Sequence, residues 1–138
     1  MNKAYLSSIN KPLTGQLIQD MKNQAFKHHI PIITDDGIRF IIQILKIKQA
    51  KKVLEIGTAI GYSSILMALF AHVKVTTIER DHQSYLMALD NVKKALMNDQ
   101  IDIIFGDAHD VEVTDDDFDV IFIDAAKGQY LNFFNESY

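Results

Sequence analysis

The segment VLEIGTAIGYS, residues 53–63, decides the fold of this chain. It begins as an apolar run typical of a buried strand, breaks at Gly57 and Gly61, and continues into a helical pattern. Glycine suits such a turn because it adopts positive φ readily and lets a ligand approach the backbone. The segment therefore predicts a strand, a nucleotide-cradling turn and a helix, with Glu55 placed just before the first glycine.

The spacing of the turn differs from the dinucleotide pattern G-x-G-x-x-G. Ala59 stands where the second glycine would be, and Tyr62 stands at the third. A pyrophosphate is therefore disfavoured. The segment resembles the acidic-x-Gly-x-Gly-x-Gly motif of S-adenosylmethionine-dependent methyltransferases, with Ala59 as the smallest replacement for the middle glycine.

Short apolar runs alternate with helical patterns along the rest of the chain, which predicts an α/β fold of parallel βαβ units. We expect strands at residues 52–56, 74–79, 101–105 and 119–124. We expect helices at residues 3–29, from Thr34 or Asp35 to about 50, and at 61–71, 82–97 and 129–135. The chain is interpreted as one domain, residues 1–138, with a helical N-terminal cap at 1–50 and a cofactor-binding core at 51–138.

The methyltransferase motif implies a Rossmann-like sheet in the order 3-2-1-4-5-7-6, of which this sequence supplies strands 3-2-1-4 and lacks 5-7-6. The apolar fourth strand, residues 120–123, would then have an open edge. Exposed edges of this kind promote association. We therefore expect the chain to be a fragment of a longer protein, truncated at its C-terminus, or to pair that edge with another chain, as in a homodimer.

Several acidic residues follow the ends of the predicted strands. Glu79 ends the second strand at the offset where an acid meets ribose hydroxyls in nucleotide-binding units, although pairing with Arg80 is the alternative. Asp107, in Gly106-Asp107-Ala108 after the third strand, is placed to accept a hydrogen bond from an adenine amino group, or is an ordinary turn residue.

Asp124 and Lys127 follow the fourth strand, which flanks the first at the switch point where ligands bind. Methyl transfer to oxygen needs a deprotonated acceptor hydroxyl. A metal ion on Asp124 would lower the pKa of that hydroxyl, and Lys127 would take the proton. The alternatives are a helix cap for Asp124 and a surface position for Lys127.

The composition limits the classes of protein that remain. The chain has no cysteine, no apolar run of about 18 residues and no signal peptide, so we expect a cytoplasmic protein without a membrane segment. The net charge of −4 is uneven: residues 1–52 carry nine Lys and Arg against three Asp, and residues 53–138 carry five against fifteen acidic residues. A basic segment favours an anionic partner such as RNA, but solvated helix faces explain it equally well.

The motifs at 53–63, 76–80, 106–108 and 118–134 together resemble the metal-dependent O-methyltransferases of the catechol and caffeoyl-coenzyme A type. Within them, residues 55–63 and 123–130 look most like the bacterial enzymes that convert 5-hydroxyuridine in tRNA to 5-methoxyuridine. The resemblance implies S-adenosylmethionine as cofactor and Mg²⁺ as metal. It implies Asp124 as metal ligand and Lys127 as base, and it assigns cofactor contacts to Ile33, Glu55, Gly57, Thr58, Gly61, Tyr62, Ser63, Glu79, Asp107, Ala108 and Asp124.

The resemblance implies that the metal site is completed by an Asp-Asn pair at the end of a fifth strand. This sequence ends before that strand. A single carboxylate would hold Mg²⁺ weakly, so we expect the 138-residue form to be inactive. The predicted function is O-methylation of 5-hydroxyuridine in tRNA. The alternatives are methylation of a small hydroxylated aromatic such as a catechol, a nucleotide-binding oxidoreductase domain, or a non-catalytic binding module.

Overall fold

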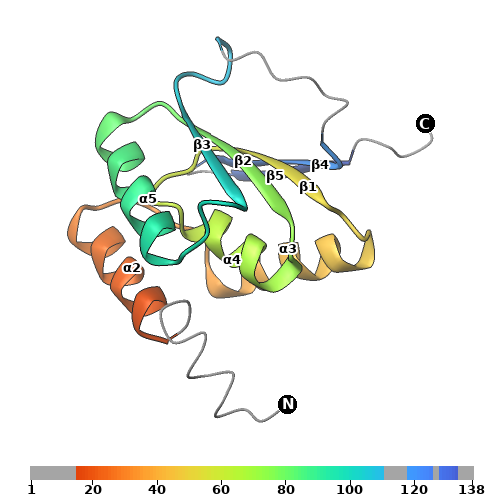
Figure 1. The fold of residues 1–138 in the computed structure, drawn as a ribbon, viewed down its shortest axis with the longest axis horizontal. Coiled ribbons are helices and arrows are strands. Elements are labelled where there is room, and N and C mark those ends of the chain that lie inside the picture. Colours follow the sequence, from red (N-terminus) through yellow and green to blue (C-terminus); the bar gives the residue numbers. More distant parts are fainter. Residues whose placement is uncertain (1–14, 111–117, 126–127, 134–138) are drawn as a thin grey trace.

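The computed structural model describes residues 15–110, 118–125 and 128–133. Four helices and five strands lie in this part of the chain, and Figure 1 shows them as one sheet with helices packed against it. Their order is α2 (Gly15–Lys27), α3 (Asp35–Ile47), β1 (Lys52–Ile56), α4 (Tyr62–Ala71), β2 (Lys74–Glu79), α5 (His82–Lys94), β3 (Ile101–Phe105), β4 (Val120–Ala125) and β5 (Gly128–Phe133).

The sheet has the order β3-β2-β1-β4-β5, and its first four strands are parallel. The predicted order 3-2-1-4 is therefore confirmed. β1, β2 and β3 are each followed or preceded by a helix, where the sequence pattern changes from short apolar runs to helical spacing. Because these four strands are parallel, the carboxyl ends of β1, β2, β3 and β4 lie at the same end of the sheet.

The predicted helix at residues 129–135 is wrong, because Gly128–Phe133 forms strand β5. β5 pairs antiparallel with β4, with Ala125 opposite Gly128 and Val120 opposite Phe133. Only two residues separate the paired strands, which is the usual length of a hairpin connection. The hairpin also corrects the expectation of an open edge on β4, since backbone groups of the same chain satisfy that edge.

Helix boundaries agree with the predictions to within a few residues where they are described. Thr34 caps α3 by accepting a hydrogen bond from the backbone N–H of Gly37 at 3.1 Å, and Asp81 caps α5 by accepting one from Ser84 N–H at 2.9 Å. The helix predicted at 3–29 is described only as α2, because residues 1–14 lie outside the described part. The helices predicted to end near 50 and 97 end at Ile47 and Lys94.

One apolar cluster joins the N-terminal helices to the sheet. It contains Met21 of α2, Leu45 of α3, Ile65 of α4 and Val53 and Val75 of the central strands. The α2–α3 region is thus packed on the same core as the βαβ units. A smaller cluster includes Leu54, Ile78 and Phe118, which are also buried. Within the described ranges, no helix combines the length and the apolar character needed to cross a membrane.

Candidate active site

The glycine turn after β1 has the backbone conformation that the sequence predicts. Gly57 and Gly61 have φ values of 96° and 87°, a region that L side chains rarely adopt. Gly57 N–H donates to the carbonyl of Ile78 at 2.9 Å, which fixes the turn to the neighbouring strand β2. A Cβ on Gly61 would stand 3.5 Å from Ala88, an ordinary contact, so its backbone angle rather than space favours glycine there.

Ala59, at the middle position of the motif, also has positive φ, at 49°. This left-handed conformation costs a non-glycine residue about 1 to 2 kcal/mol. The backbone N–H of Ala59 donates to Oε1 of Glu79 at 2.7 Å. The turn is thus held in this conformation by the acid at the end of the adjacent strand.

Glu79 has both carboxylate oxygens engaged by the backbone. Oε1 accepts from Ala59, and Oε2 accepts from the N–H of Asp81 at 2.8 Å. Glu79 is only 9% exposed, yet it lines the pocket described below. A carboxylate oxygen has about two acceptor positions, so each oxygen of Glu79 retains one for a ligand hydroxyl.

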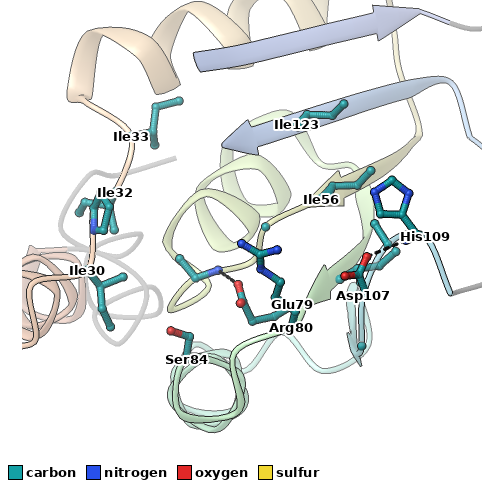
Figure 2. Close-up of a pocket in the computed structure, with 16 residues that line it drawn as sticks. Ile30, Ile32, Ile33, Ile56, Glu79, Arg80, Ser84, Asp107, His109 and Ile123 are labelled. Carbon is teal, nitrogen blue, oxygen red and sulfur yellow. Dashed lines mark hydrogen bonds between the residues drawn. The ribbon is translucent and has the colours of Figure 1, made fainter. Parts of the chain in front are cut away.

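A pocket of about 670 Å³ opens at the carboxyl ends of the parallel strands (Figure 2). Ile56, Ile78 and Ile123 contribute apolar walls from β1, β2 and β4, and Gly106 and Asp107 follow β3. This is the edge at which open α/β sheets bind ligands. The volume and the mixture of apolar walls with a few polar groups are typical of small-molecule sites.

Five of the predicted cofactor residues line this pocket: Ile33, Gly57, Glu79, Asp107 and Ala108. Figure 2 shows Ile30, Ile32 and Ile33 on one side and Asp107 and His109 on the other, with Glu79 and Arg80 between them. The Oδ1 atom of Asp107 accepts from the backbone N–H of His109 at 2.9 Å, which orients that carboxylate within its turn.

The other residues in and around the turn that were predicted to contact the cofactor do not line the pocket. Glu55 is fully buried, and its carboxylate accepts hydrogen bonds from the hydroxyls of Ser63, Ser64 and Thr77, the last at 2.7 Å. Thr58 Oγ1 lies 2.6 Å from Thr77 Oγ1. Because Thr77 donates its single hydroxyl proton to Glu55, Thr58 must donate to Thr77. This polar network connects β1, β2, the turn and the start of α4.

Tyr62 and Gly61 likewise support the turn from outside the pocket lining. Tyr62 begins α4, and its hydroxyl donates to Oδ1 of Asp35 at 3.4 Å. Asp35 also forms an ion pair with Lys22 at 3.0 Å, so the interaction joins α2, α3 and α4. Burial raises the pKa of the Tyr62 phenol above its ordinary value. Direct cofactor contact by Glu55, Thr58, Gly61, Tyr62 or Ser63 stays a prediction.

Asn91 is a supporting residue that sequence reasoning missed. It is buried in α5, and its side-chain amide donates to the carbonyl of Ile60 at 2.8 Å and to Oε1 of Gln24 at 2.9 Å. The glycine turn is therefore bonded to α5, and Asn91 in turn links α5 to α2. An asparagine inside a helix has no distinctive sequence pattern, so only the fold reveals this role.

The pocket also contains residues with no predicted role, notably Arg80, Ser84 and His109. Among the described residues that line it, Arg80 is the only Lys or Arg. Its place directly after Glu79, at the end of a predicted strand, was the signal that could have identified it. Ser84 comes from the first turn of α5, which begins immediately after the same strand.

Asp124 lies in β4 directly after the pocket residue Ile123 and opposite Gln129 of β5. Its side chain and the whole of Lys127 lie outside what the structure describes, so their predicted catalytic and metal-binding roles stay predictions. Among the described residues, no group of three His, Cys, Asp or Glu side chains is arranged to hold a metal ion. The residues described here therefore do not by themselves form a magnesium site.

The family model described as O-methyltransferase matches residues 6–138. A catechol O-methyltransferase from Niastella koreensis is 37% identical over 103 residues, which cover 70% of this chain and 47% of the relative. A caffeoyl-CoA O-methyltransferase from Medicago sativa is 31% identical over 134 residues, covering 88% of this chain and 54% of the relative.

Among solved structures, an O-methyltransferase from Bacillus cereus in complex with SAH matches with a TM-score of 0.70 and 26% identity. The match covers 88% of this chain and 59% of that one. The chain spans about half the length of the curated relatives named above. With a family model that matches almost its entire length, the chain belongs to the O-methyltransferase family.

Proposed function

We propose that the protein is an S-adenosylmethionine-dependent O-methyltransferase whose acceptor is a small hydroxylated aromatic molecule. The observation that carries the proposal is the pocket at the carboxyl ends of β1 to β4, with the glycine turn on one side and Glu79 within it. The family match and the SAH complex of the Bacillus cereus relative support the cofactor. The names of the catechol and caffeoyl-CoA relatives support the acceptor class.

The residues of the pocket suit the parts of this cofactor. Glu79 retains acceptor positions for the two ribose hydroxyls, and Asp107 can accept from the adenine amino group. The backbone at Gly57 admits the ligand closely because no Cβ stands there. Ile33, Ile56 and Ile123 supply apolar walls that exclude water from the ligand.

The bound cofactor supplies an electrophilic methyl carbon; a C–O bond forms as the S–CH₃ bond breaks, and its electron pair stays on sulfur. The acceptor hydroxyl must lose its proton for this transfer. We propose, from the sequence, that Lys127 accepts that proton and that Asp124 would be one ligand of a divalent cation, which would lower the pKa of the hydroxyl. Beyond this proton transfer, the protein contributes chiefly by holding the acceptor in the correct orientation for methyl transfer.

A tRNA containing 5-hydroxyuridine is the second candidate acceptor, favoured by the positive charge of residues 1–52. Part of this charge, at Lys51 and Lys52, lies away from the pocket. Lys51 lies directly before β1, and Lys52 and Lys74 are paired in register at the amino ends of β1 and β2. The pocket lies at the opposite ends of these strands, about 16 Å away at 3.3 Å per residue. This placement favours the small acceptor.

Calorimetry with S-adenosylmethionine, SAH and NAD tests the cofactor, and we expect binding of the first two only. Glu79→Gln should weaken that binding, whereas Asp102→Asn, the same chemical change at an exposed position of β3, should not. Binding of NAD alone would end the methyltransferase proposal. Transfer of labelled methyl to catechol, caffeoyl-CoA and tRNA bearing 5-hydroxyuridine then identifies the acceptor, and methylation of the tRNA alone would reverse the preference stated here.

A further inference from the structure

Arg80 lines the pocket but takes no part in the hydrogen bonds that hold the glycine turn. It follows Glu79 directly, at the end of β2. Figure 2 shows its side chain extending from this strand end toward the middle of the pocket, between the segment 30–33 and Asp107. Arg80 is exposed, so its guanidinium is accessible to a ligand that enters the pocket.

No described residue occupies this guanidinium. Within residues 15–110, 118–125 and 128–133, Arg80 forms no hydrogen bond or ion pair. The carboxylate that precedes it in sequence, that of Glu79, instead accepts from the backbone N–H groups of Ala59 and Asp81. A guanidinium is planar, carries five N–H donors and is weakly hydrated on its faces. Both the donors and the faces of Arg80 are therefore available to a ligand.

The ends of β2 and β3 fix where an adenosine group would lie. Glu79 is paired in register with Phe105, and the two strands are neighbours about 5 Å apart. The backbone N–H of Gly106 donates to the carbonyl of Glu79 at 2.8 Å, which holds the loop after β3 beside residue 80. With the ribose on Glu79 and the adenine amino group on Asp107, the purine ring lies next to Arg80.

We propose that the guanidinium of Arg80 stacks on one face of the adenine ring and contributes much of the affinity for the nucleoside part of the cofactor. Because the ligand is taken to be S-adenosylmethionine, this role rests on the proposed function. The electron-rich face of an aromatic ring attracts a cation, and the planar guanidinium lies flat against it. Isoleucines of β1, β2 and β4 supply the apolar walls around the ligand.

His109 is the other described lining residue whose side chain stacks well on a purine. It lies two residues after Asp107, and its backbone N–H donates to the Oδ1 atom of that residue at 2.9 Å. His109 is thus tied to the residue that we place at the amino edge of the ring. Arg80 comes from the neighbouring strand, beside the proposed ribose site, and is better placed to cover the face of the ring.

Calorimetry with SAH and variants of Arg80 tests the stacking. Arg80→Met keeps an aliphatic side chain but removes the planar cation, and we expect SAH to bind about 5- to 10-fold more weakly. Arg80→Lys should lose nearly as much, because an ammonium keeps the charge without the plane. Full affinity in Arg80→Lys would assign the effect to charge alone and overturn the stacking.

The matched control is Arg39→Met, the same chemical change at the only other arginine of the sequence. Arg39 lies on α3, its side chain is 77% exposed, and it does not line the pocket. Its substitution should leave the affinity for SAH unchanged. Because Arg80 is exposed and bonds no described residue, Arg80→Met without ligand should unfold at the same temperature as the unmodified protein.

A shortened ligand separates stacking from an ion pair with the carboxylate of the cofactor. 5′-Methylthioadenosine has the adenosine group but no amino acid part, so Arg80→Met should weaken its binding by the same factor as that of SAH. A loss confined to SAH would pair Arg80 with the carboxylate and refute the stacking. Neither ligand carries the sulfonium charge, so the loss of a positive charge from the pocket affects both alike.

A changed base separates the face of the ring from its edge. S-inosylhomocysteine has an oxo group in place of the adenine amino group, so it should bind the unmodified protein more weakly through the loss of the bond to Asp107. Arg80→Met should still weaken its binding about 5- to 10-fold, because the face of the ring is retained. Equal binding of every ligand to Arg80→Met and Arg39→Met would refute the role of Arg80 and leave the methyltransferase proposal standing. Failure of the unmodified protein to bind SAH would refute both.

Discussion

The Oε1 atom of Glu79 accepts a hydrogen bond from the backbone N–H of Ala59 at 2.7 Å, which joins the acid predicted to bind ribose to the turn predicted to cradle the cofactor. The same carboxylate accepts from Asp81 N–H through Oε2. Glu79 therefore has two tasks: it fixes the conformation of the turn and presents its remaining acceptor positions to the pocket. Substitutions at this residue should affect binding and local order together.

Glu79→Gln should weaken S-adenosylmethionine binding by about 10- to 100-fold. A hydrogen bond to a charged group contributes about 1.5 to 3 kcal/mol, and 1.4 kcal/mol corresponds to a tenfold change in affinity. The glutamine can still accept from Ala59 N–H, but its NH₂ group cannot accept from Asp81 or from a ribose hydroxyl. Calorimetric titration measures the effect, with Asp102→Asn as the matched control. An unchanged dissociation constant would remove Glu79 from the ribose site.

Ala59→Gly should stabilise the protein by about 0.5 kcal/mol. Release from the left-handed conformation gains about 1 to 2 kcal/mol, and the greater freedom of glycine in the unfolded chain offsets about 0.5 to 1 kcal/mol of that. Thermal unfolding gives the sign. Ala68→Gly, in the interior of α4, is the control and should destabilise the protein by about 1 kcal/mol. Destabilisation by Ala59→Gly would show that its methyl group has a packing role in the pocket.

Asn91→Leu should destabilise the protein by about 1 to 3 kcal/mol, because the buried carbonyl of Ile60 loses the donor at 2.8 Å. Since that carbonyl belongs to the glycine turn, the substitution should also weaken cofactor binding. Gln24→Ala removes only the second partner of Asn91 and should have the smaller effect on both quantities. Denaturant unfolding and calorimetry measure the two effects. Equal losses from the two variants would argue against a specific role for the bond to Ile60.

The sequence predicted those parts of the structure that depend on local pattern. The strands β1 to β4, the cap at Thr34, and the positive φ of Gly57 and Gly61 all follow from apolar runs, a capping residue and glycine. It failed at Gly128–Phe133, where a short segment with aromatic residues suits a helix or a strand and pairing with β4 decides. Tertiary pairing of this kind has no local signal.

The candidate site was predictable in position but only partly in the roles of its residues. Glu79 and Asp107 follow strands, so they were expected at the edge where the pocket lies. Glu55 also lies near a strand end, but its side chain points into the polar network with Ser63 and Thr77. Which side of a parallel strand faces the ligand depends on the packing of helices on the sheet, which residue spacing does not give.

The ion pair between Lys22 and Asp35 should make a small, pH-dependent contribution to stability. The hydrogen bond from Lys22 holds the pKa of Asp35 below its ordinary value of 3.8, and the same bond raises the pKa of Lys22 above 10.5. The Asp35 contribution is therefore present above pH 3.8 and is lost as pH falls through its depressed pKa. The Lys22 contribution is present below pH 10.5 and is lost as pH rises through its raised pKa.

Both side chains of this pair are at least one third exposed, so solvent limits their coupling to about 0.5 kcal/mol. A double-mutant cycle with Lys22→Met and Asp35→Asn, measured by denaturant unfolding, should show that coupling at neutral pH and lose it in acid. The pair Arg39 and Asp36, 3.9 Å apart and more exposed, should show none. A coupling that persists at pH 2 would refute the assignment to charge.

The substitution Thr77→Val tests whether the buried polar network around Glu55 stabilises the fold without taking part in cofactor binding. Thr77 Oγ1 donates to Glu55 at 2.7 Å and lies 2.6 Å from Thr58 Oγ1, so valine leaves two buried polar groups without this partner. We expect a loss of about 2 to 4 kcal/mol in the free energy of unfolding, at about 1 to 2 kcal/mol per group. Thr76→Val, on the opposite face of the same strand, should be nearly neutral because Thr76 is only half-buried. Chemical denaturation of both variants measures the difference, and similar stabilities would show that the network around Glu55 contributes little to the fold. Because Thr77 does not line the pocket, cofactor affinity measured well below the unfolding transition should fall less for Thr77→Val than for Glu79→Gln.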